Sequence, residues 1–282
     1  MRFLKGHGTG NDFVLLPDAD AQLSLPDGVV QAVCDRHFGV GADGVLRVVP
    51  TEAVAEVAHL AGDAQWFMDY RNADGTAVEM CGNGIRVFAR YLYDAGLVTG
   101  EHVAIATRDG IKSVTRRDAQ TYAVDMGPPV IGDPASISIE VDGAKYDVTD
   151  VSMGNPHAVL FVDDVPGSPV RELGPRIETL AVFPRGTNVE FVAVAGRGLT
   201  MRVWERGVGE TMSCGTGACA AAVASAYAGH TGRTVDVDVP GGRLQIDWTE
   251  AGPVTLTGPA IFVASGEFDA GWLAGQAARS VR

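Results

Sequence analysis

Much of the chain alternates between apolar and polar residues, which is the pattern of short strands that bury one face. Gly, Asp and Pro separate these stretches, and such residues are typical of turns. The pattern predicts strands at residues 13–18, 44–49, 102–107, 121–127, 157–164, 188–194, 199–205, 235–242 and 243–248. Strands therefore dominate the predicted structure.

Helical patterns are confined to a few segments. Residues 26–37 begin with Pro and Asp, which suit the entrance of a helix. Residues 84–95 and 217–228 each follow a Cys-Gly-x-Gly sequence, and the second of these segments is apolar or small on all sides. That composition is typical of a helix that is enclosed all round. Many strands around one enclosed helix in each half predict an α+β fold and not a doubly wound βαβ sheet.

The two halves of the chain also resemble each other in sequence. The segment TGNDFVLL around Asn11 resembles MGNPHAVLF around Asn155, which aligns the two asparagines. The segment FGVGADGVL resembles FPRGTNVEF, and their alignment places Asp43 opposite Asn188. These matches predict an internal duplication with a period of domain size, which is too long for a solenoid repeat.

The Cys-Gly-x-Gly sequences belong to the same repeat. NADGTAVEMCGNG resembles ERGVGETMSCGTG, so that Asn72 aligns with Glu205 and Cys81 with Cys214. The stretch from Asn11 to Cys81 is about a dozen residues longer than the stretch from Asn155 to Cys214. A loop accommodates an insertion of this length at low cost. Its natural place is 49–65.

The repeat predicts two similar domains that face each other across a cleft. The first domain is expected at residues 1–119 and the second at 120–263. The tail 264–282 is short and can return to the first domain.

Composition narrows the class of protein. Lys and Arg number 22 against 35 Asp and Glu, a net charge of −13, which argues against partners such as nucleic acid or an anionic membrane surface. No apolar stretch has the length of a signal peptide core or of a membrane-spanning helix. The four cysteines are too few and too scattered for a disulfide scaffold. We therefore expect a cytoplasmic protein with reduced thiols.

A cysteine directly before a helix has distinctive chemistry. Free N–H groups and the positive end of the helix dipole are expected to lower its pKa. The following glycines let the backbone approach an anion such as a carboxylate. A single copy of Cys-Gly-x-Gly is equally compatible with a tight turn that carries a buried structural thiol.

Two copies in equivalent places favour catalysis. One thiolate can remove the α-proton of an amino acid while the opposite thiol protonates the other face, as in a racemase or epimerase. Pyridoxal phosphate would need a lysine, but Lys5, Lys112 and Lys145 lie in no glycine-rich phosphate context. We expect no cofactor and no metal, since Cys214 and Cys219 lack a second pair of ligands.

The motifs identify a resemblance to the diaminopimelate epimerase family over nearly the whole chain. They are HGTGNDFV, RNADGT…MCGNGIR, SMGNPH, TNVEF and ERGVGETMSCGTGAC, in this order. The resemblance implies two similar α+β domains, each a curled, mostly antiparallel sheet around a central helix. It also implies cofactor-free interconversion of LL- and meso-2,6-diaminopimelate in lysine and peptidoglycan precursor biosynthesis, by a homodimer.

The resemblance also implies the residues of the site. Cys81 and Cys214 would be the acid/base pair, and His157 and Glu205 would tune their pKa values. The substrate would be bound by Asn11, Asn72, Gly82, Asn83, Asn155, Asn188, Glu205, Arg206, Gly215 and Thr216. Arg206 offers a fork for the distal carboxylate of a substrate with two amino-acid ends, and Glu205 offers an acceptor for its distal ammonium.

Other interpretations of the same residues are open. A racemase of proline or hydroxyproline would also use a cysteine pair, and an anion-binding protein would use the glycine-rich turns without catalysis. The asparagines beside Gly or Pro are also typical of turns. Cys34 and Cys219 are expected in the core, His7 in a structural role, and Arg86 and Arg90 in internal ion pairs.

Overall fold

The computed structural model describes residues 1–250 and 252–279, and the chain divides into two compact units. Unit 1 comprises Met1–Val124 together with the segment that begins at Pro259, and unit 2 comprises Asp125–Gly258. The sequence places the corresponding boundaries after residues 119 and 263, within a few residues of these divisions. The chain thus leaves unit 1 once and comes back to it near its end.

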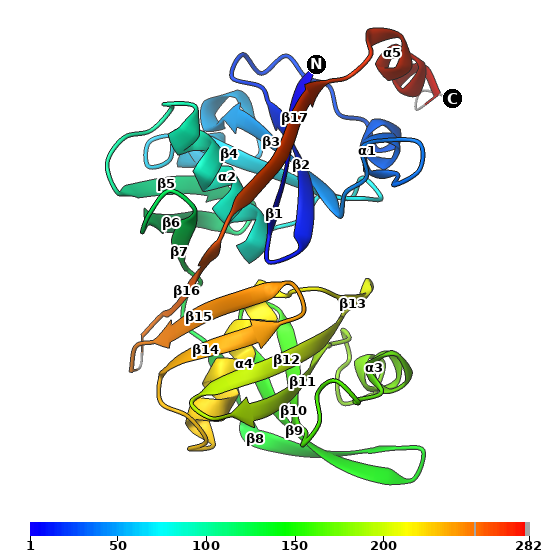
Figure 1. Cartoon of the computed structure of the whole chain (residues 1–282), viewed down its shortest axis with the longest axis vertical. Helices are drawn as coiled ribbons and strands as arrows, with labels where there is room; N and C mark the ends of the chain where they lie inside the picture. The colour runs from blue at the N-terminus through cyan, green and yellow to red at the C-terminus, as the bar shows by residue number, and fades with distance from the viewer. Residues whose placement is uncertain (251, 280–282) are drawn as a thin grey trace. The chain divides into compact units, whose positions relative to one another are not determined.

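Unit 1 is a mixed sheet in which antiparallel pairs predominate (Figure 1). Only the pairs β2–β3 and β4–β5 are parallel among the pairs described for this unit. Along the sheet the strands are β17 (Ile261–Glu267), β1 (Arg2–Gly8), β2 (Asn11–Pro17), β3 (Gly44–Pro50), β4 (Trp66–Asn72), β5 (His102–Thr107), β6 (Gly110–Arg116) and β7 (Thr121–Asp125).

Unit 2 repeats this arrangement of strands. Its pairs β10–β11 and β12–β14 are parallel, and its other described pairs are antiparallel. Along the sheet the strands are β8 (Val130–Val141), β9 (Ala144–Ser152), β10 (Pro156–Phe161), β11 (Asn188–Ala195), β12 (Gly198–Glu205), β14 (Thr234–Val239), β15 (Gly242–Trp248) and β16 (Val254–Pro259), with β13 (Gly209–Thr211) beside β12. The same order of parallel and antiparallel pairs in both units supports the internal duplication.

Each unit encloses one helix. In unit 1, α2 (Gly82–Asp94) packs against β1 to β4, and in unit 2, α4 (Gly215–Tyr227) packs against β9 to β12, β14 and β15. Every residue of α4 from Ala218 to Ser225 is buried, as expected from its run of alanines. The fold is therefore α+β, with the predicted helix at the centre of each sheet.

A second helix covers the other face of each sheet. In unit 1, α1 (Asp27–Cys34) packs on β2 and β3, while α5 (Ala270–Arg279) contacts α1. In unit 2, α3 (Val170–Glu178) packs on β11 and β12. The inner strands are thus buried on both faces, which explains why Phe13 to Leu16 form a continuous apolar run without alternation.

The strand register corrects one detail of the sequence alignment. Phe13 pairs with Gly44 in unit 1, and His157 pairs with Asn188 in unit 2. The counterpart of Asn188 is therefore Gly44 and not Asp43, so the predicted pairing was wrong by one residue. Sequence similarity did not resolve this shift, although a shift by one residue moves a side chain to the opposite face of a strand.

The structure confirms the predicted strands and helices and adds elements that the pattern missed. The segment 49–65 contains two 3-10 turns, η1 (Thr51–Ala53) and η2 (Ala58–Leu60). It forms a small core of its own, in which Val57 and Ala64 pack with Phe67 of β4. The hairpin of β8 and β9 and the helix α3 were also missed.

Candidate functional site

Each central helix begins at one of the two Cys-Gly-x-Gly sequences. Cys81 and Cys214 are the N-cap residues of α2 and α4, and both have extended backbone angles. Their sulfur atoms accept hydrogen bonds from the N–H groups of Gly84 and Gly217, each at 3.4 Å. This cap starts each helix two residues earlier than predicted, because the cysteine side chain satisfies an otherwise free N–H.

The last glycine of each sequence allows a close approach of the helix to the sheet. A Cβ at Gly84 would lie 3.2 Å from Leu46 and 3.5 Å from Phe13. A Cβ at Gly217 would lie only 2.7 Å from Oε1 of Glu190. The glycines therefore bring each cysteine against the inner face of its own sheet.

In unit 1, two asparagines surround the thiol of Cys81. The thiol donates to Oδ1 of Asn11 at 3.6 Å, and Nδ2 of Asn83 donates to the same oxygen at 3.3 Å. Asn83 is itself buried, and its Oδ1 accepts from Nη2 of Arg86 at 3.0 Å and from Thr9. The predicted residues Asn11, Gly82 and Asn83 thus lie together with Cys81.

A charged network holds Asn11 in place. Its Nδ2 donates to Asp43 at 2.8 Å, and Arg36 joins Asp43 to Asp12 through ion pairs of 2.7 and 2.8 Å. Burial raises the pKa of Asp12, but hydrogen bonds from Arg36 and Lys5 outweigh it and hold this pKa far below its usual range. Asn11 is therefore anchored to a network of ion pairs through Asp43.

Asn72 lies at the end of β4, in the turn that precedes the cysteine. Its Oδ1 accepts from the Tyr70 hydroxyl at 2.9 Å, and its Nδ2 donates to Thr76 at 3.3 Å. Its backbone N–H also bonds to the carbonyl of Thr76. These contacts are those of turn chemistry, so a substrate-binding role for Asn72 stays a prediction.

The two arginines of α2 differ from each other. Arg90 forms the expected ion pair, with Asp94 at 3.2 Å. Arg86 is fully buried and donates hydrogen bonds to the carbonyls of Gly82 and Pro259 at 2.9 and 3.1 Å. Arg86 thus fastens the first turn of α2 to the segment that returns to unit 1.

In unit 2, a continuous chain of hydrogen bonds leads away from Cys214. Its sulfur lies 3.5 Å from Oγ1 of Thr216, which accepts from Nδ2 of Asn155 at 3.3 Å. Oδ1 of Asn155 lies 3.0 Å from Nε2 of His157, and Nδ1 of His157 lies 2.7 Å from Glu190. The structure thus brings Asn155, His157 and Thr216 together with Cys214.

Glu205 approaches the same cysteine from the end of β12. It accepts from the Thr211 hydroxyl at 2.5 Å and also hydrogen-bonds with Cys214. Burial raises the pKa of Glu205. Its position supports the predicted role of tuning the thiol.

Asn188 and Arg206 lie next to each other through the backbone. Oδ1 of Asn188 accepts from the N–H of Arg206 at 2.9 Å, and its Nδ2 donates to the carbonyl of Pro156 at 2.8 Å. Arg206 is exposed, and its guanidinium donates to the carbonyl of Arg185 at 3.1 Å. Asn188 therefore fixes the backbone that carries the exposed guanidinium.

The expected direction of the cysteine pKa is wrong for Cys214. Burial raises its pKa well above the usual value, and the carboxylates of Glu205 and Glu190 add to the effect. Hydrogen bonds from Thr216 and from the N–H of Gly217 lower the pKa but do not compensate. The helix terminus is outweighed because Cys214 is only 5% exposed and lies beside two acidic groups.

The remaining cysteines lie in the core, as expected. Cys34 is the last residue of α1 and packs into the core of unit 1, where burial raises its pKa to about 12, and Cys219 is fully buried in α4. Within residues 1–250 and 252–279, no group of three or more His, Cys, Asp or Glu side chains could hold a metal ion. Over the same residues, no helix is long and apolar enough to cross a membrane.

Sequence reasoning missed Glu190, which lies behind Cys214. Its strand was interpreted from apolar alternation alone, and Val189 and Phe191 on either side of it do face the core under α3. An acidic residue in a strand that is buried on both faces is the signal that could have identified it.

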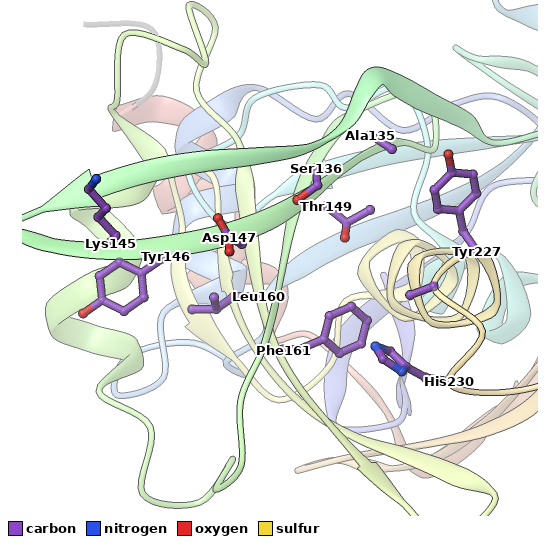
Figure 2. Close-up of a pocket in the computed structure, with 11 residues that line it drawn as sticks. Ala135, Ser136, Lys145, Tyr146, Asp147, Thr149, Leu160, Phe161, Tyr227 and His230 are labelled. Carbon is purple, nitrogen blue, oxygen red and sulfur yellow. The ribbon is translucent and has the colours of Figure 1, made fainter.

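A separate pocket of unit 2 contains none of the predicted site residues (Figure 2). It measures about 530 Å³ and lies between the hairpin of β8 and β9, the strand β10 and the end of α4. Among the residues that line it are Ser136, Lys145, Asp147, Tyr227 and His230. The cysteine half-site of unit 2 is therefore distinct from this pocket.

Comparison with known proteins identifies the family of this chain. The sequence model of the diaminopimelate epimerase family matches residues 3–132 and 149–263. The chain is 49% identical to a diaminopimelate epimerase of Streptomyces coelicolor over 97% of both chains, and 48% identical to one of Thermobifida fusca over 95% of this chain and 97% of that one. A probable proline racemase from Agrobacterium radiobacter has the same fold, with a TM-score of 0.72 at 15% identity over 95% of this chain and 93% of that one. This chain therefore belongs to the diaminopimelate epimerase family.

Proposed function

We propose that this protein interconverts LL- and meso-2,6-diaminopimelate, with Cys81 and Cys214 as its two acid/base groups. The observation that carries the proposal is the equivalent place of the two cysteines. Each caps the central helix of its own unit and accepts a hydrogen bond of 3.4 Å from the last glycine of the motif. Membership of the family gives the substrate class.

The proposed reaction moves one proton at each face of the α-carbon. One cysteine takes part as a thiolate and removes the α-proton, and the other takes part as a thiol and delivers a proton to the opposite face. The reaction therefore requires the two sulfur atoms to reach opposite faces of one carbon. Because its environment raises its pKa, Cys214 is suited to start as the thiol.

The developing carbanion needs electrostatic stabilisation. Backbone N–H groups at Gly82 and Asn83 in α2, and at Gly215 and Thr216 in α4, lie in the first turns of their helices. Groups of this kind stabilise an anion at a helix N-terminus. We assign them to the α-carboxylate.

The distal end of the substrate requires groups of its own. The exposed guanidinium of Arg206 can form a bidentate pair with the distal carboxylate, while Asn72, Asn155 and Asn188 offer amide groups for binding. Such contacts would select against an amino acid with a single head, since the polar groups would be left unpaired.

The localisation, the oligomeric state and the independence of a cofactor are proposed from membership of the family. We propose that the protein is a cytoplasmic homodimer that needs no cofactor. Light scattering of the purified protein tests the oligomeric state.

The test of the function is incubation with pure LL-diaminopimelate in D₂O. NMR should show the meso isomer with one solvent deuterium at the inverted carbon. Cys81→Ala and Cys214→Ala should each lower the rate by about 10² to 10⁴. Cys219→Ala serves as the matched control, because Cys219 lies in α4 but faces the core, and it should retain the activity.

Two results would contradict the proposal. Exchange with proline and not with diaminopimelate would overturn the substrate and leave the cysteine chemistry intact. Full activity after removal of either Cys81 or Cys214 would overturn the two-base mechanism.

A further inference from the structure

The environment behind Cys214 contains a buried pair of a histidine and a carboxylate, which is an ion pair when the ring is protonated. Oε1 of Glu190 lies 2.7 Å from Nδ1 of His157, and both side chains are fully buried. A buried ion pair is weak evidence for stability, because desolvation opposes the attraction between the charges. The presence of His157 and Glu190 at buried positions is therefore not explained by stability alone.

Unit 1 shows how the same place is filled without charges. By the strand register, Leu46 and Phe13 correspond to Glu190 and His157. Leu46 and Phe13 are fully buried and lie beside Gly84. The duplicated fold thus accommodates an apolar pair at this position, and the ion pair distinguishes Cys214 from Cys81.

The directions of the hydrogen bonds follow from the chemistry of the groups. The two ring nitrogens of His157 face a carboxylate oxygen of Glu190 and the amide oxygen of Asn155. With Asn155 oriented in this way both partners are acceptors, an arrangement that an imidazolium ring would satisfy from both of its nitrogens. Oγ1 of Thr216 accepts from Nδ2 of Asn155, which leaves the hydroxyl hydrogen free to point at the sulfur of Cys214.

Loss of one proton from His157 would reverse these directions. A neutral ring that donates to Glu190 would present a lone pair to Asn155, so the amide would turn and donate to the ring. Asn155 would then accept from Thr216, whose hydroxyl hydrogen would no longer point at Cys214. The protonated ring is therefore the form in which Thr216 donates to the sulfur.

We propose that Glu190 is a positioning residue that keeps His157 doubly protonated and so directs the Thr216 hydroxyl at Cys214. A hydroxyl that donates to sulfur stabilises the thiolate, which Cys214 must become when it acts as the base. The assignment rests on the proposed function of Cys214, but its first consequence is the charge of a buried ring, which can be measured without turnover.

The surrounding charges make Glu190 the direct counter-ion of the ring. Its Oε2 is buried and has no hydrogen-bond partner among the described residues, so its contact with His157 is through Oε1. Asp150 on the neighbouring strand β9 and Glu205 on β12 also act electrostatically on the ring, and Cys214 lies at the end of the relay. Of the three carboxylates, Glu190 is the one that contacts the ring, at 2.7 Å.

Glu190→Gln tests the proposal, because glutamine keeps the shape and an acceptor but removes the charge. With diaminopimelate as substrate, we expect kcat to fall on the order of tenfold, the effect of losing one charge-assisted hydrogen bond. KM should change little. The kcat profile should move to lower pH both because the ring loses its counter-ion and because Glu190 no longer raises the pKa of Cys214 directly, so the state of the ring is read from its own signal. Glu210→Gln is the matched control, since Glu210 pairs with Arg171 and Arg202 away from the relay.

The protonation of the ring is measured independently by ¹⁵N NMR of histidine-labelled protein, with the His157 signal assigned by its loss in His157→Gln. We expect both nitrogens of His157 to be protonated near neutral pH in the unaltered chain, and the ring to lose a proton at lower pH in Glu190→Gln. A neutral His157 in the unaltered chain would overturn the proposal, even if the variant failed to fold. A folded Glu190→Gln chain with an unchanged pH profile and ring signal would also overturn it. Absence of diaminopimelate turnover in the unaltered chain would instead contradict the proposed function.

Discussion

Cys81 and Cys214 occupy equivalent places in their helices, but the side chains behind them differ in kind. Leu46 and Phe13 lie beside the first turn of α2, whereas Glu190 lies beside the first turn of α4. Burial, Glu205 and Glu190 together raise the pKa of Cys214. The duplication therefore preserves the backbone of the two half-sites and not their electrostatics.

Glu205→Gln should make the thiolate of Cys214 form at lower pH. Glu205 is one of two carboxylates that raise the pKa of this thiol, and a negative neighbour disfavours the charged form. The rate of iodoacetamide labelling at Cys214, followed by mass spectrometry in a Cys81→Ala chain, gives the half-point. An unchanged half-point would show that Glu205 does not contribute to the raised pKa, and Glu210→Gln is the control.

Asp12→Asn should destabilise the protein at neutral pH but not in acid. The pKa of Asp12 in the folded state lies below the usual 3.8 of the unfolded chain. The stabilisation is therefore present above about pH 4 and is lost as the pH falls toward the folded-state pKa. We expect a loss of about 1 to 3 kcal/mol in the free energy of unfolding at neutral pH.

Urea unfolding at about pH 7 and about pH 2 measures this difference, because the stabilisation falls away only as the pH approaches the low folded-state pKa. The exposed Asp20 provides the control substitution, Asp20→Asn. An equal loss for Asp12→Asn at both values would contradict the ionised network around Asn11.

At the scale of elements, the first turn of each central helix is fixed by a cysteine cap and a glycine. Gly84 and Gly217 have equivalent places, but their neighbours differ in how far they can move. The Leu46 side chain can shift by a few tenths of an ångström, whereas Glu190 is held by its pair with His157. The same substitution should therefore have unequal effects in the two helices.

Gly217→Ala should lower the free energy of unfolding by about 1 to 3 kcal/mol. Its Cβ would meet Oε1 of Glu190 at 2.7 Å and would force that carboxylate away from His157. Gly84→Ala meets Leu46 at 3.2 Å and should change stability by less than about 1 kcal/mol, because alanine also favours the helix. Urea unfolding of both variants measures the contrast, and equal losses would contradict it.

The pattern predicted these elements well where local periodicity was strong. The strands β11 and β12 and the helix α4 lie where the sequence placed them. The helix α3 was missed because it contains Gly174 and Pro175, which oppose a helix in isolation. It forms because Val170 and Ile177 are buried in the core of unit 2 and Gly174 lies against Trp204.

At the scale of the molecule, the end of the chain completes unit 1. The strand β17 pairs with β1 along its length, and the carbonyls of Pro259 and Ala260 accept from Arg86 and Arg90. Phe268 and Trp272 then pack into the core under α1. Unit 1 is therefore not a continuous segment of sequence.

A chain that ends after Gly258 should show no cooperative unfolding of unit 1. It lacks β17 and leaves β1 with one unpaired edge, and the buried Arg86 loses an acceptor. A chain that ends after Asp269 keeps β17 and Phe268, and it should lose about 1 to 2 kcal/mol from the apolar contacts of Trp272 and Leu273. Thermal unfolding followed by circular dichroism distinguishes them, and equal Tm values would contradict this role of β17.

The sequence by itself determined the strands with a strong apolar pattern, the central helices, the duplication and the family, because these follow from local periodicity and from motifs of fixed spacing. Only the tertiary structure decided that Gly44 is the counterpart of Asn188, that Glu190 stands behind Cys214, and that the pKa of this cysteine is raised. Strand register, burial and charge all depend on residues far apart in the chain. A helix terminus predicts a lowered thiol pKa, but burial and, after it, the distant carboxylates that the fold brings beside the thiol reverse the sign.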